Sequence, residues 1–379
     1  MPRTRRTTTA IAALAVAAVL GGAATLLVGP RPPSLDGASV TGDAALAEDL
    51  LAALGPDGVR AASVAVVDLA APADERVRTA AVGVLDDDGA PVRPGTPFET
   101  GSVAKALDGL LLAEMLAAGE VRLDEPVADL VPGTALAEDG GATLGELATH
   151  RSGLPRLPAS MLLTSPVLRV TGGDPYTGGP ADVLDAAGRA GAPGGAGPRY
   201  SNLGAAALGQ ALAARAGVPW DELLAARVLG PAGLTATTVA TAPDEVPADG
   251  ARPVTAAGRD VAPWVAEGWA PAGVGTWSTA EDLGRLALGL LEGTAPGAAA
   301  LDPVDDDPAR ADEGLLWVVG AGADHPEVVW HNGGTGGTST FVGLDRGAGR
   351  AVVVLATTDR TVDDAALAVL AGTGDEVTR

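Results

Sequence analysis

One apolar run in the first third of the chain limits what this sequence can fold into. It covers Ala106 to Ala118 and follows directly on Phe98-Glu99-Thr100-Gly101-Ser102-Val103-Ala104-Lys105. The large apolar residues within it recur at helical spacing: Leu107, Leu110, Leu111, Met115 and Leu116. This spacing predicts an amphipathic or buried helix that begins at about Ser102. We expect the rest of the chain to be organised around it.

Ser102 and Lys105 form a candidate catalytic pair at the start of this helix. The helix N-terminus places the Ser102 hydroxyl beside unpaired backbone N–H groups and the positive end of the helix dipole, which suits the stabilisation of an oxyanion. Lys105 lies one turn further on the same face. A hydroxyl and a neutral amine so placed can act as nucleophile and base. The alternative is a plain N-cap serine followed by a solvated lysine.

Composition favours the catalytic interpretation. Lys105 is the only lysine in the chain, although lysine and arginine together number 25. A guanidinium supplies a permanent charge but does not deprotonate in proteins, so a lysine kept among arginines indicates a need for an amine that can lose its proton. Asparagine occurs only at Asn202 and Asn332, and tyrosine only at Tyr176 and Tyr200. Three of these four lie in Tyr200-Ser201-Asn202 and His331-Asn332-Gly333-Gly334, where we expect the rest of a site.

The N-terminal segment, residues 1–37, is distinct from the rest of the chain. Arginines at positions 3, 5 and 6 precede an uncharged run from Ile11 to Gly29 and then Pro30-Arg31-Pro32-Pro33. This is the layout of an export signal or of a single membrane anchor. Since the apolar run continues past the small residue Ala24, we favour an uncleaved anchor over cleavage. The predicted location is extracytoplasmic, membrane-anchored or secreted.

Charge and cysteine content exclude several classes of partner. The net charge of −23 repels nucleic acid, and the chain has no cysteine for disulfides or thiol chemistry. Asp86-Asp87-Asp88-Gly89 follows a predicted strand, and we interpret it as a hairpin turn and not as part of a calcium loop. We therefore predict no metal, no cofactor and a monomer that acts on a small-molecule or peptide substrate.

Strand patterns occur at both ends of the chain. Alternating or apolar runs predict strands over Ala61 to Leu69, Arg78 to Leu85, Glu327 to His331, Thr338 to Leu344 and Arg350 to Ala356. Helices are expected over Ala44 to Leu54, from a cap at Ser278 or Thr279 to Leu291, and over Val362 to Leu370.

The middle of the chain has a different character. Short helical segments, including Leu144 to Ala148 and Leu203 to Ala216, alternate with Gly- and Pro-rich connections, and Thr171 to Gly197 is expected to form loops near the site. We predict an α/β (α+β) fold, in which residues 38–126 and 264–379 form an antiparallel sheet domain flanked by helices. Residues 127–263 form a mostly helical domain inserted between these sheet-forming termini.

Taken in order, three motifs resemble those of the penicillin-recognising serine hydrolases, in the branch of class C β-lactamases, D-alanyl-D-alanine carboxypeptidases and related esterases. Ser102-Val103-Ala104-Lys105 resembles the family's S-x-x-K, Tyr200-Ser201-Asn202 its Y-x-N, and His331-Asn332-Gly333 an H-x-G form of its K-T-G. Thr149 to Pro155 and Trp330 to Gly337 also resemble family segments. The resemblance covers roughly residues 45 to 371 and implies a β-lactamase-like fold.

The resemblance also implies a mechanism of acyl transfer. Ser102 would attack a carbonyl, Lys105 and Tyr200 would share the proton traffic, and Asn202 would orient them. Backbone N–H groups of Ser102 and Gly334 would form the oxyanion hole, and His331, Asn332, Gly333 and Gly334 would line the substrate-binding edge strand. His150, in a segment that resembles a family loop, would be structural.

The histidine at position 331 bears on the substrate. A lysine there would present a fixed charge to a substrate carboxylate, whereas histidine is mostly neutral near pH 7. This favours a D-alanyl peptidase or an esterase over an efficient β-lactamase. Two other classes stay open: a catalytically idle protein of the same fold that binds cell-wall fragments or β-lactams, and a structural envelope protein. The single lysine favours the enzyme.

Overall fold

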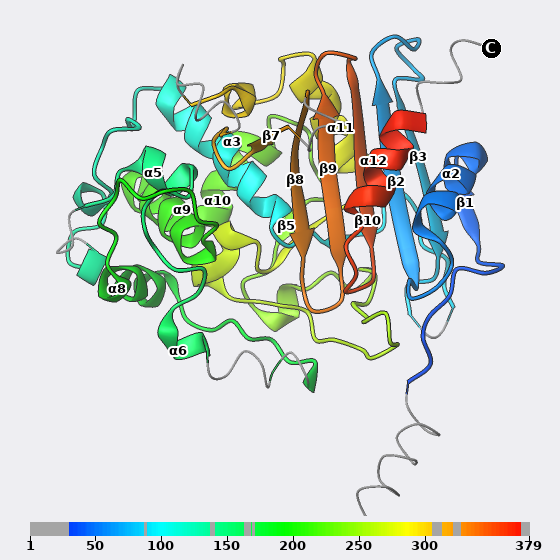
Figure 1. The fold of residues 1–379 in the computed structure, drawn as a ribbon, viewed down its shortest axis with the longest axis horizontal. Coiled ribbons are helices and arrows are strands. Elements are labelled where there is room, and N and C mark those ends of the chain that lie inside the picture. Colours follow the sequence, from blue (N-terminus) through cyan, green and yellow to red (C-terminus); the bar gives the residue numbers. More distant parts are fainter. Residues whose placement is uncertain are drawn as a thin grey trace, which may run out of the picture.

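The computed structural model describes residues 30–86, 89–136, 141–162, 168, 171–304, 313–320 and 327–372. An antiparallel sheet with helices on both of its faces lies beside a lobe of helices (Figure 1). The predicted α/β architecture with an antiparallel sheet is confirmed. The predicted division at residues 126 and 264 stays a prediction.

The main sheet has seven strands in the order β1-β3-β2-β10-β9-β8-β7, and each neighbouring pair is antiparallel. Three strands come from the N-terminal part of the chain and four from the C-terminal part. Their bounds are β1 Val40–Gly42, β2 Ala61–Asp68, β3 Val77–Gly83, β7 Val318–Val319, β8 Val328–Gly334, β9 Ser339–Asp345 and β10 Arg350–Ala356.

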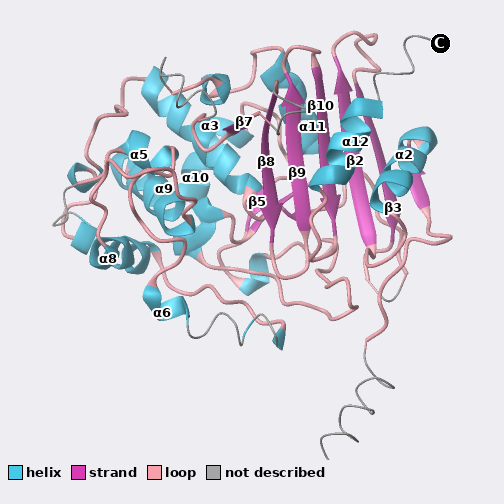
Figure 2. Ribbon diagram, in the orientation of Figure 1, coloured by secondary structure: helices cyan, strands magenta, loops and turns pink. Residues whose placement is uncertain are grey.

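The two groups of strands join where β2 pairs with β10, with Val64 opposite Val354. Alternate residues of these strands face opposite sides of the sheet, and both sides are buried. On one side α2 (Ala44–Leu54) and α12 (Asp363–Gly372) cover the sheet, and on the other side α11 (Ala280–Leu291) does so (Figure 2). Burying each large aliphatic side chain in these layers contributes about 1.5–3 kcal/mol.

The predicted central helix is α3, Val103–Ala117, and it is buried, not amphipathic. Its large side chains belong to the core layer that also contains α11 and the inner face of the sheet. A second, three-stranded sheet leads into it, in the order β4-β6-β5, with bounds β4 Phe98–Glu99, β5 Thr238–Val239 and β6 Thr276–Ser278. The antiparallel pair of β4 and β6 therefore fixes the entry to α3.

The lobe of helices lies on the side of α3 that faces away from the seven-stranded sheet (Figure 1). Its α-helices are α5 Leu144–Ala148, α6 Ala159–Leu162, α8 Pro180–Ala190, α9 Asn202–Ala216 and α10 Trp220–Leu224. A π-helix, η2 Ala225–Leu229, continues α10, and the described 3₁₀-helices are η1 Val127–Asp129, η3 Pro243–Glu245, η4 Glu267–Ala272 and η5 Ala298–Leu301. The helix α9 is buried over most of its length.

Most predicted elements are found close to their expected bounds, with two differences. The segment from Thr171 to Gly197 was expected to form loops but contains α8, which begins at Pro180 and buries Val183, Leu184 and Ala187. Proline at the first helical position favours this start, which the glycines around it obscure in the sequence. Strand β8 also continues beyond His331 to Gly334, because its last residues still pair with β9.

The predicted turn at Asp86 is a hairpin, since the backbone N–H of Leu85 donates to the carbonyl of Ala90 at 2.8 Å. Residues 87 and 88 lie outside the described residues. So does the predicted anchor or signal from Ile11 to Gly29. Within the described ranges, every helix is too short or too polar to cross a bilayer.

Candidate active site

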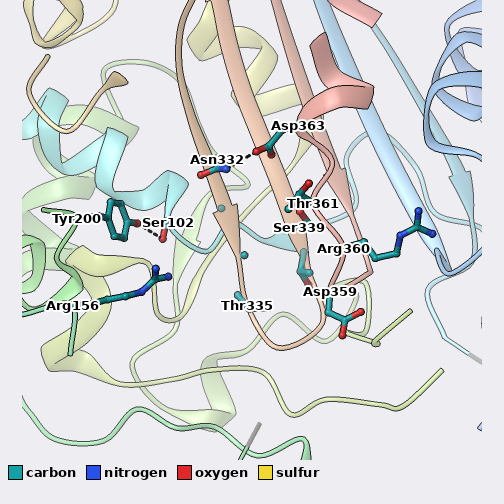
Figure 3. A pocket seen from close by; sticks show the side chains of 13 residues that line it. Ser102, Arg156, Tyr200, Asn332, Thr335, Ser339, Asp359, Arg360, Thr361 and Asp363 are labelled. Atoms are coloured by element: carbon teal, nitrogen blue, oxygen red, sulfur yellow. Dashed lines mark hydrogen bonds between the residues drawn. The ribbon is translucent and has the colours of Figure 1, made fainter. Parts of the chain in front are cut away.

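Ser102 lies at the junction between β4 and α3, where it is the N-cap residue of the helix. Its side chain makes no capping hydrogen bond to the helix backbone, so the interpretation as a plain N-cap is wrong. The hydroxyl instead faces a cavity of about 400 Å³ between the helical lobe and the end of β8 (Figure 3). Ser102 thus lies at a helix N-terminus with a hydroxyl that does not cap the helix.

Lys105 approaches Ser102 from one turn further along α3. Its Nζ lies 2.9 Å from Ser102 Oγ and also donates to the backbone carbonyl of Ala272. The side chain is fully buried. Burial lowers the pKa of the Lys105 amine from its usual value; the nearby Tyr200 and Asp108 oppose this shift and the Arg156 charge adds to it. The sole lysine is therefore in contact with the candidate nucleophile, in surroundings that favour its neutral form.

Tyr200 approaches from the other side, in the loop that leads into α9. Its Oη donates a hydrogen bond to Ser102 Oγ at 2.8 Å. The Nζ of Lys105 lies 5.2 Å from the centre of the Tyr200 ring. Lys105, three residues from Ser102, and Tyr200, 98 residues from it, thus converge on the Ser102 hydroxyl oxygen, which is the arrangement that the motifs implied.

Two histidines flank the Tyr200 ring. The ring of His150 lies 4.7 Å from it and the ring of His331 lies 6.5 Å from it, measured between centres. Burial, reinforced by the nearby Lys105, lowers the pKa of both histidines to about 3. Both are therefore neutral at physiological pH, so β8 presents no histidine charge to the cavity. His150 also accepts a hydrogen bond from the Ser201 backbone at 3.3 Å, consistent with a structural part.

Asn202, the first residue of α9, is placed differently from what the resemblance implied. Its Nδ2 donates to the Tyr176 hydroxyl at 3.1 Å, whereas the expectation was that it would orient Lys105 and Tyr200. Its Oδ1 is buried and has no hydrogen-bond partner among the described residues. Asn202 and Ser102 line the same small cavity.

Glycines allow the end of β8 to press against the start of α3. Gly101 has a φ of +51°, and a Cβ there would lie 2.6 Å from the backbone nitrogen of Gly334. A Cβ on Gly333 would lie 2.0 Å from the Thr100 carbonyl oxygen and 3.1 Å from the Ser102 nitrogen. Side chains at either position would separate the two segments. The backbone groups of Ser102 and Gly334 therefore lie next to each other, where the resemblance implied an oxyanion hole.

The remaining predicted residue, Asn332, points toward α12. Its Nδ2 donates to Asp363 Oδ2 at 2.7 Å, as the dashed line in Figure 3 shows. The structure thus brings all eight predicted site residues to one region. Six of them line the cavities around Ser102, while Lys105 and His331 lie in the buried layer behind it.

Some residues around Ser102 were not predicted from the sequence. Arg156 lines the cavity. Glu99, three residues before Ser102, accepts hydrogen bonds from the Trp264 backbone at 2.8 Å and from the Thr335 hydroxyl at 2.7 Å. Asp108, one turn beyond Lys105, is fully buried and accepts from the Trp220 indole at 2.8 Å. The two acids carried a signal, since each interrupts an otherwise apolar or neutral stretch; Arg156 carried none. Within the described ranges, no cluster of three potential metal ligands occurs.

Comparison with known proteins agrees with this geometry. Residues 49–372 match the family described as Beta-lactamase. A penicillin-binding protein 4 of Amycolatopsis lactamdurans is 33% identical over 172 residues, which is 44% of this chain and 42% of that protein, so the match spans less than half of the relative's length.

Two solved structures share the fold over most of the chain. A class C β-lactamase from Rhodobacter sphaeroides superposes with a TM-score of 0.69 at 20% identity, over 89% of this chain and 100% of that one. A D-alanine carboxypeptidase from Burkholderia cenocepacia gives 0.66 at 22% identity, over 86% and 99%. Since the family match covers far more than half of the sequence, the chain belongs to the β-lactamase family.

Proposed function

We propose that this protein is a serine hydrolase that forms an acyl-enzyme at Ser102 and acts on an amide or an ester. The observation that carries the proposal is the position of Ser102 Oγ, 2.9 Å from Lys105 Nζ and 2.8 Å from Tyr200 Oη. Nucleophilic catalysis by serine requires a group within hydrogen-bond reach that can take its proton. The buried amine of Lys105, with its lowered pKa, is such a group.

The reaction follows from these positions. Ser102 Oγ attacks the substrate carbonyl carbon, and its proton passes to Lys105 Nζ, directly or through Tyr200 Oη. The carbonyl oxygen becomes an oxyanion held by the backbone N–H groups of Ser102 and Gly334. When the bond to the leaving group breaks, the same proton returns through Tyr200 to the leaving nitrogen or oxygen. Water then attacks the ester to Ser102 and releases the acid.

Asn202 supports an amide as the substrate. Asn202 lines a small cavity together with Ser102, and its buried Oδ1 has no partner among the described residues; a buried acceptor without a donor costs about 1–3 kcal/mol. An N–H group of a bound peptide would satisfy it, whereas an ester oxygen carries no proton. A peptide bond is therefore favoured over an ester as the natural substrate.

Among amides, we favour a D-alanyl peptide. His331 is buried and neutral, so β8 lacks the fixed charge that would hold the carboxylate of a β-lactam or of a peptide terminus, and an anionic substrate needs a positive charge elsewhere in the site. A carboxypeptidase of similar fold and a relative described as a penicillin-binding protein are consistent with a cell-wall peptide. Such a substrate, together with the basic and apolar N-terminal segment, leads us to propose an extracytoplasmic location.

The test is intact-mass spectrometry of the full-length protein after incubation with a fluorophosphonate or a penicillin. One adduct that maps to Ser102 and is missing in Ser102→Ala is expected. An adduct on another residue, or equal labelling of the variant, contradicts the assignment. Turnover of a D-alanyl-D-alanine peptide, a short p-nitrophenyl ester and a chromogenic cephalosporin then ranks the substrates. Binding of these compounds without labelling or turnover would identify a catalytically idle binding protein.

A further inference from the structure

Arg156 lies where three cavities meet beside the candidate nucleophile. It lines the cavity in front of Ser102 together with Tyr200, a larger second cavity with Thr335, and a small third one with Asn202. Figure 3 shows its guanidinium directed toward the cavity beside Ser102. A ligand that reaches Ser102 through any of these spaces passes this side chain.

The helix α9 fixes the main chain of Arg156. The Arg156 carbonyl accepts the backbone N–H groups of Asn202 at 3.2 Å and of Leu203 at 3.3 Å. Its guanidinium carbon lies 5.3 Å from the centre of the Tyr200 ring, within the range of a cation–π contact. The start of α9, which directly follows Tyr200, therefore also fixes the position of Arg156.

The charge of Arg156 is uncommitted in the part of the chain that the structure describes. No described carboxylate lies within ion-pair distance of its guanidinium, and its guanidinium donates no hydrogen bond to a described residue. By contrast, Arg151, five residues earlier, is paired with Glu313, and Arg360, which also lines the cavity, donates to the Asp57 carbonyl at 3.0 Å. In a chain with 48 acidic residues, an unpaired arginine next to a nucleophile stands out.

Of the other basic groups around the cavity, Arg360 keeps its charge, but its side chain extends away from Ser102 (Figure 3) and donates to the Asp57 carbonyl. Lys105 is buried with a lowered pKa, and His150 and His331 have pKa values of about 3. Arginine keeps its charge throughout and binds a carboxylate through two parallel hydrogen bonds. An anionic group of a ligand at Ser102 would thus find its partner on the helical lobe and not on β8.

We propose that Arg156 is a specificity-determining residue that binds a carboxylate, or an equivalent anionic group, of the substrate acylated at Ser102. The kinetic test of this inference rests on the proposed function, because it requires the turnover of esters at Ser102. It assigns the recognition of the anion to the loop between α5 and α6. It also predicts that the preferred substrates are anionic despite the acidic net charge of the chain.

The experiment uses three p-nitrophenyl esters of similar length that differ in the charge at the acyl end: the hydrogen adipate, the methyl adipate and the aminohexanoate. We compare kcat/KM of the full-length protein with that of Arg156→Gln, Arg156→Lys and a control, Arg122→Gln. Arg122 lies on the surface, paired with the exposed Asp124, so the control removes the same charge away from the site.

The expected result is a change in selectivity. Arg156→Gln lowers the preference for the anionic over the neutral ester by about 10- to 100-fold, the size expected for a charge-assisted hydrogen bond. Arg156→Lys restores part of it, and Arg122→Gln keeps the parental preference within about twofold. A second pair, the p-carboxyphenyl and p-carbamoylphenyl hexanoates, shows whether the anion belongs to the acyl or to the leaving group.

Three results overturn the proposal. The first is an equal loss on all esters in Arg156→Gln, which would make Arg156 an electrostatic part of the catalytic apparatus. The second is unchanged selectivity in both ester series. The third is a parental preference for the cationic ester.

A binding measurement separates this proposal from the proposed function. Calorimetric titration of Ser102→Ala with adipate and its dimethyl ester, with and without Arg156→Gln, reports on Arg156 even when no ester is turned over. Binding of adipate that is about 10- to 100-fold tighter with Arg156 than with glutamine supports the inference independently of acylation. Equal affinities contradict it.

Discussion

At the scale of single residues, Lys105 separates the effect of charge from the effect of proton transfer. Lys105→Arg keeps a positive charge near Ser102 and Tyr200 but removes the ability to hold or release a proton at neutral pH. We expect the variant to melt like the parent and to lose acylation by roughly 100- to 10,000-fold, as when a general base is removed. The rate of fluorophosphonate labelling measures this. Activity within about tenfold of the parent, or about 1.4 kcal/mol of barrier, would exclude proton transfer by Lys105.

Glu99 predicts how stability depends on pH. Burial raises the pKa of its carboxyl to about 7 from an ordinary value of 4.5. In the window between these values the folded protein keeps a proton that the unfolded chain has lost, so this residue's contribution to stability is complete below about pH 4.5 and is lost as the pH rises to about 7.

Glu99→Gln should remove this dependence, since glutamine does not titrate; its single side-chain oxygen can still accept from the Trp264 backbone, and its NH₂ group can donate to the Thr335 hydroxyl oxygen. Relative to the parent, we expect the fall in the free energy of unfolding from about pH 5 to about pH 7 to be smaller by about 1–2 kcal/mol. Urea unfolding at several pH values measures it, with the exposed Glu48→Gln as the matched control. Parallel curves for parent and Glu99→Gln would show that Glu99 is ionised in the folded protein.

The residues predicted from the sequence were those whose type is rare in it. Lys105, Tyr200 and Asn202 stood out because each belongs to a residue type that the chain uses once or twice. Arg156 is one of many arginines, and its significance depends on which carboxylates lie near it in space. Asn202 lines a cavity with Ser102, but its partner, Tyr176, comes from a loop whose path the sequence does not indicate.

At the scale of elements, the contact between β8 and the start of α3 predicts that alanine substitutions at two glycines affect catalysis differently. Gly101 and Gly119 both have positive φ values, +51° and +69°, but a Cβ on Gly101 would lie 2.6 Å from Gly334 N, while a Cβ on Gly119 would meet nothing within 4 Å. Each alanine variant pays a backbone strain of about 1–2 kcal/mol.

We expect only Gly101→Ala to separate the Ser102 and Gly334 N–H groups and to lower kcat by about 100- to 1,000-fold, as when an oxyanion-hole donor is lost. Gly119→Ala should lose a similar amount of stability and keep its kcat. Thermal melting and steady-state kinetics of both variants test the pair. Equal kcat values would show that the close approach does not serve catalysis.

Helices and strands whose residues follow one clear pattern were predicted close to their bounds. Segments that combine helix-forming and turn-forming residues were not assigned correctly. The strands β2 and β10 are nearly continuous apolar runs, and α2 follows directly on its N-cap Asp43. The helix α8 was missed because glycines surround it, although Pro180 fixes its first turn. The pairing of β2 with β10 could be expected only in outline, because its register depends on contacts between residues nearly 300 positions apart.

At the scale of the whole molecule, the net charge of −23 predicts a response to salt. Like charges on a folded surface repel one another, and salt shortens the range of this repulsion from about 30 Å at about 10 mM to about 8 Å at about 150 mM. We expect the melting temperature at pH 8 to rise by about 1–3 °C over this range. The rise should be smaller near pH 5, where fewer carboxylates are ionised, and a fall with added salt would contradict the prediction.

The central pairing of β2 with β10 also sets the order of events during synthesis. Ser102 and its helix leave the ribosome early, but β8, which forms the opposite wall of the site, is held in the sheet by β9 and β10. Residues 61–68 must therefore wait for residues 350–356 before the sheet closes. Contacts this distant in sequence slow folding. Ser102, the proposed nucleophile, thus lacks a complete site until β10 has been synthesised, and we expect the nascent chain to become able to form an acyl-enzyme only after this strand has joined the sheet.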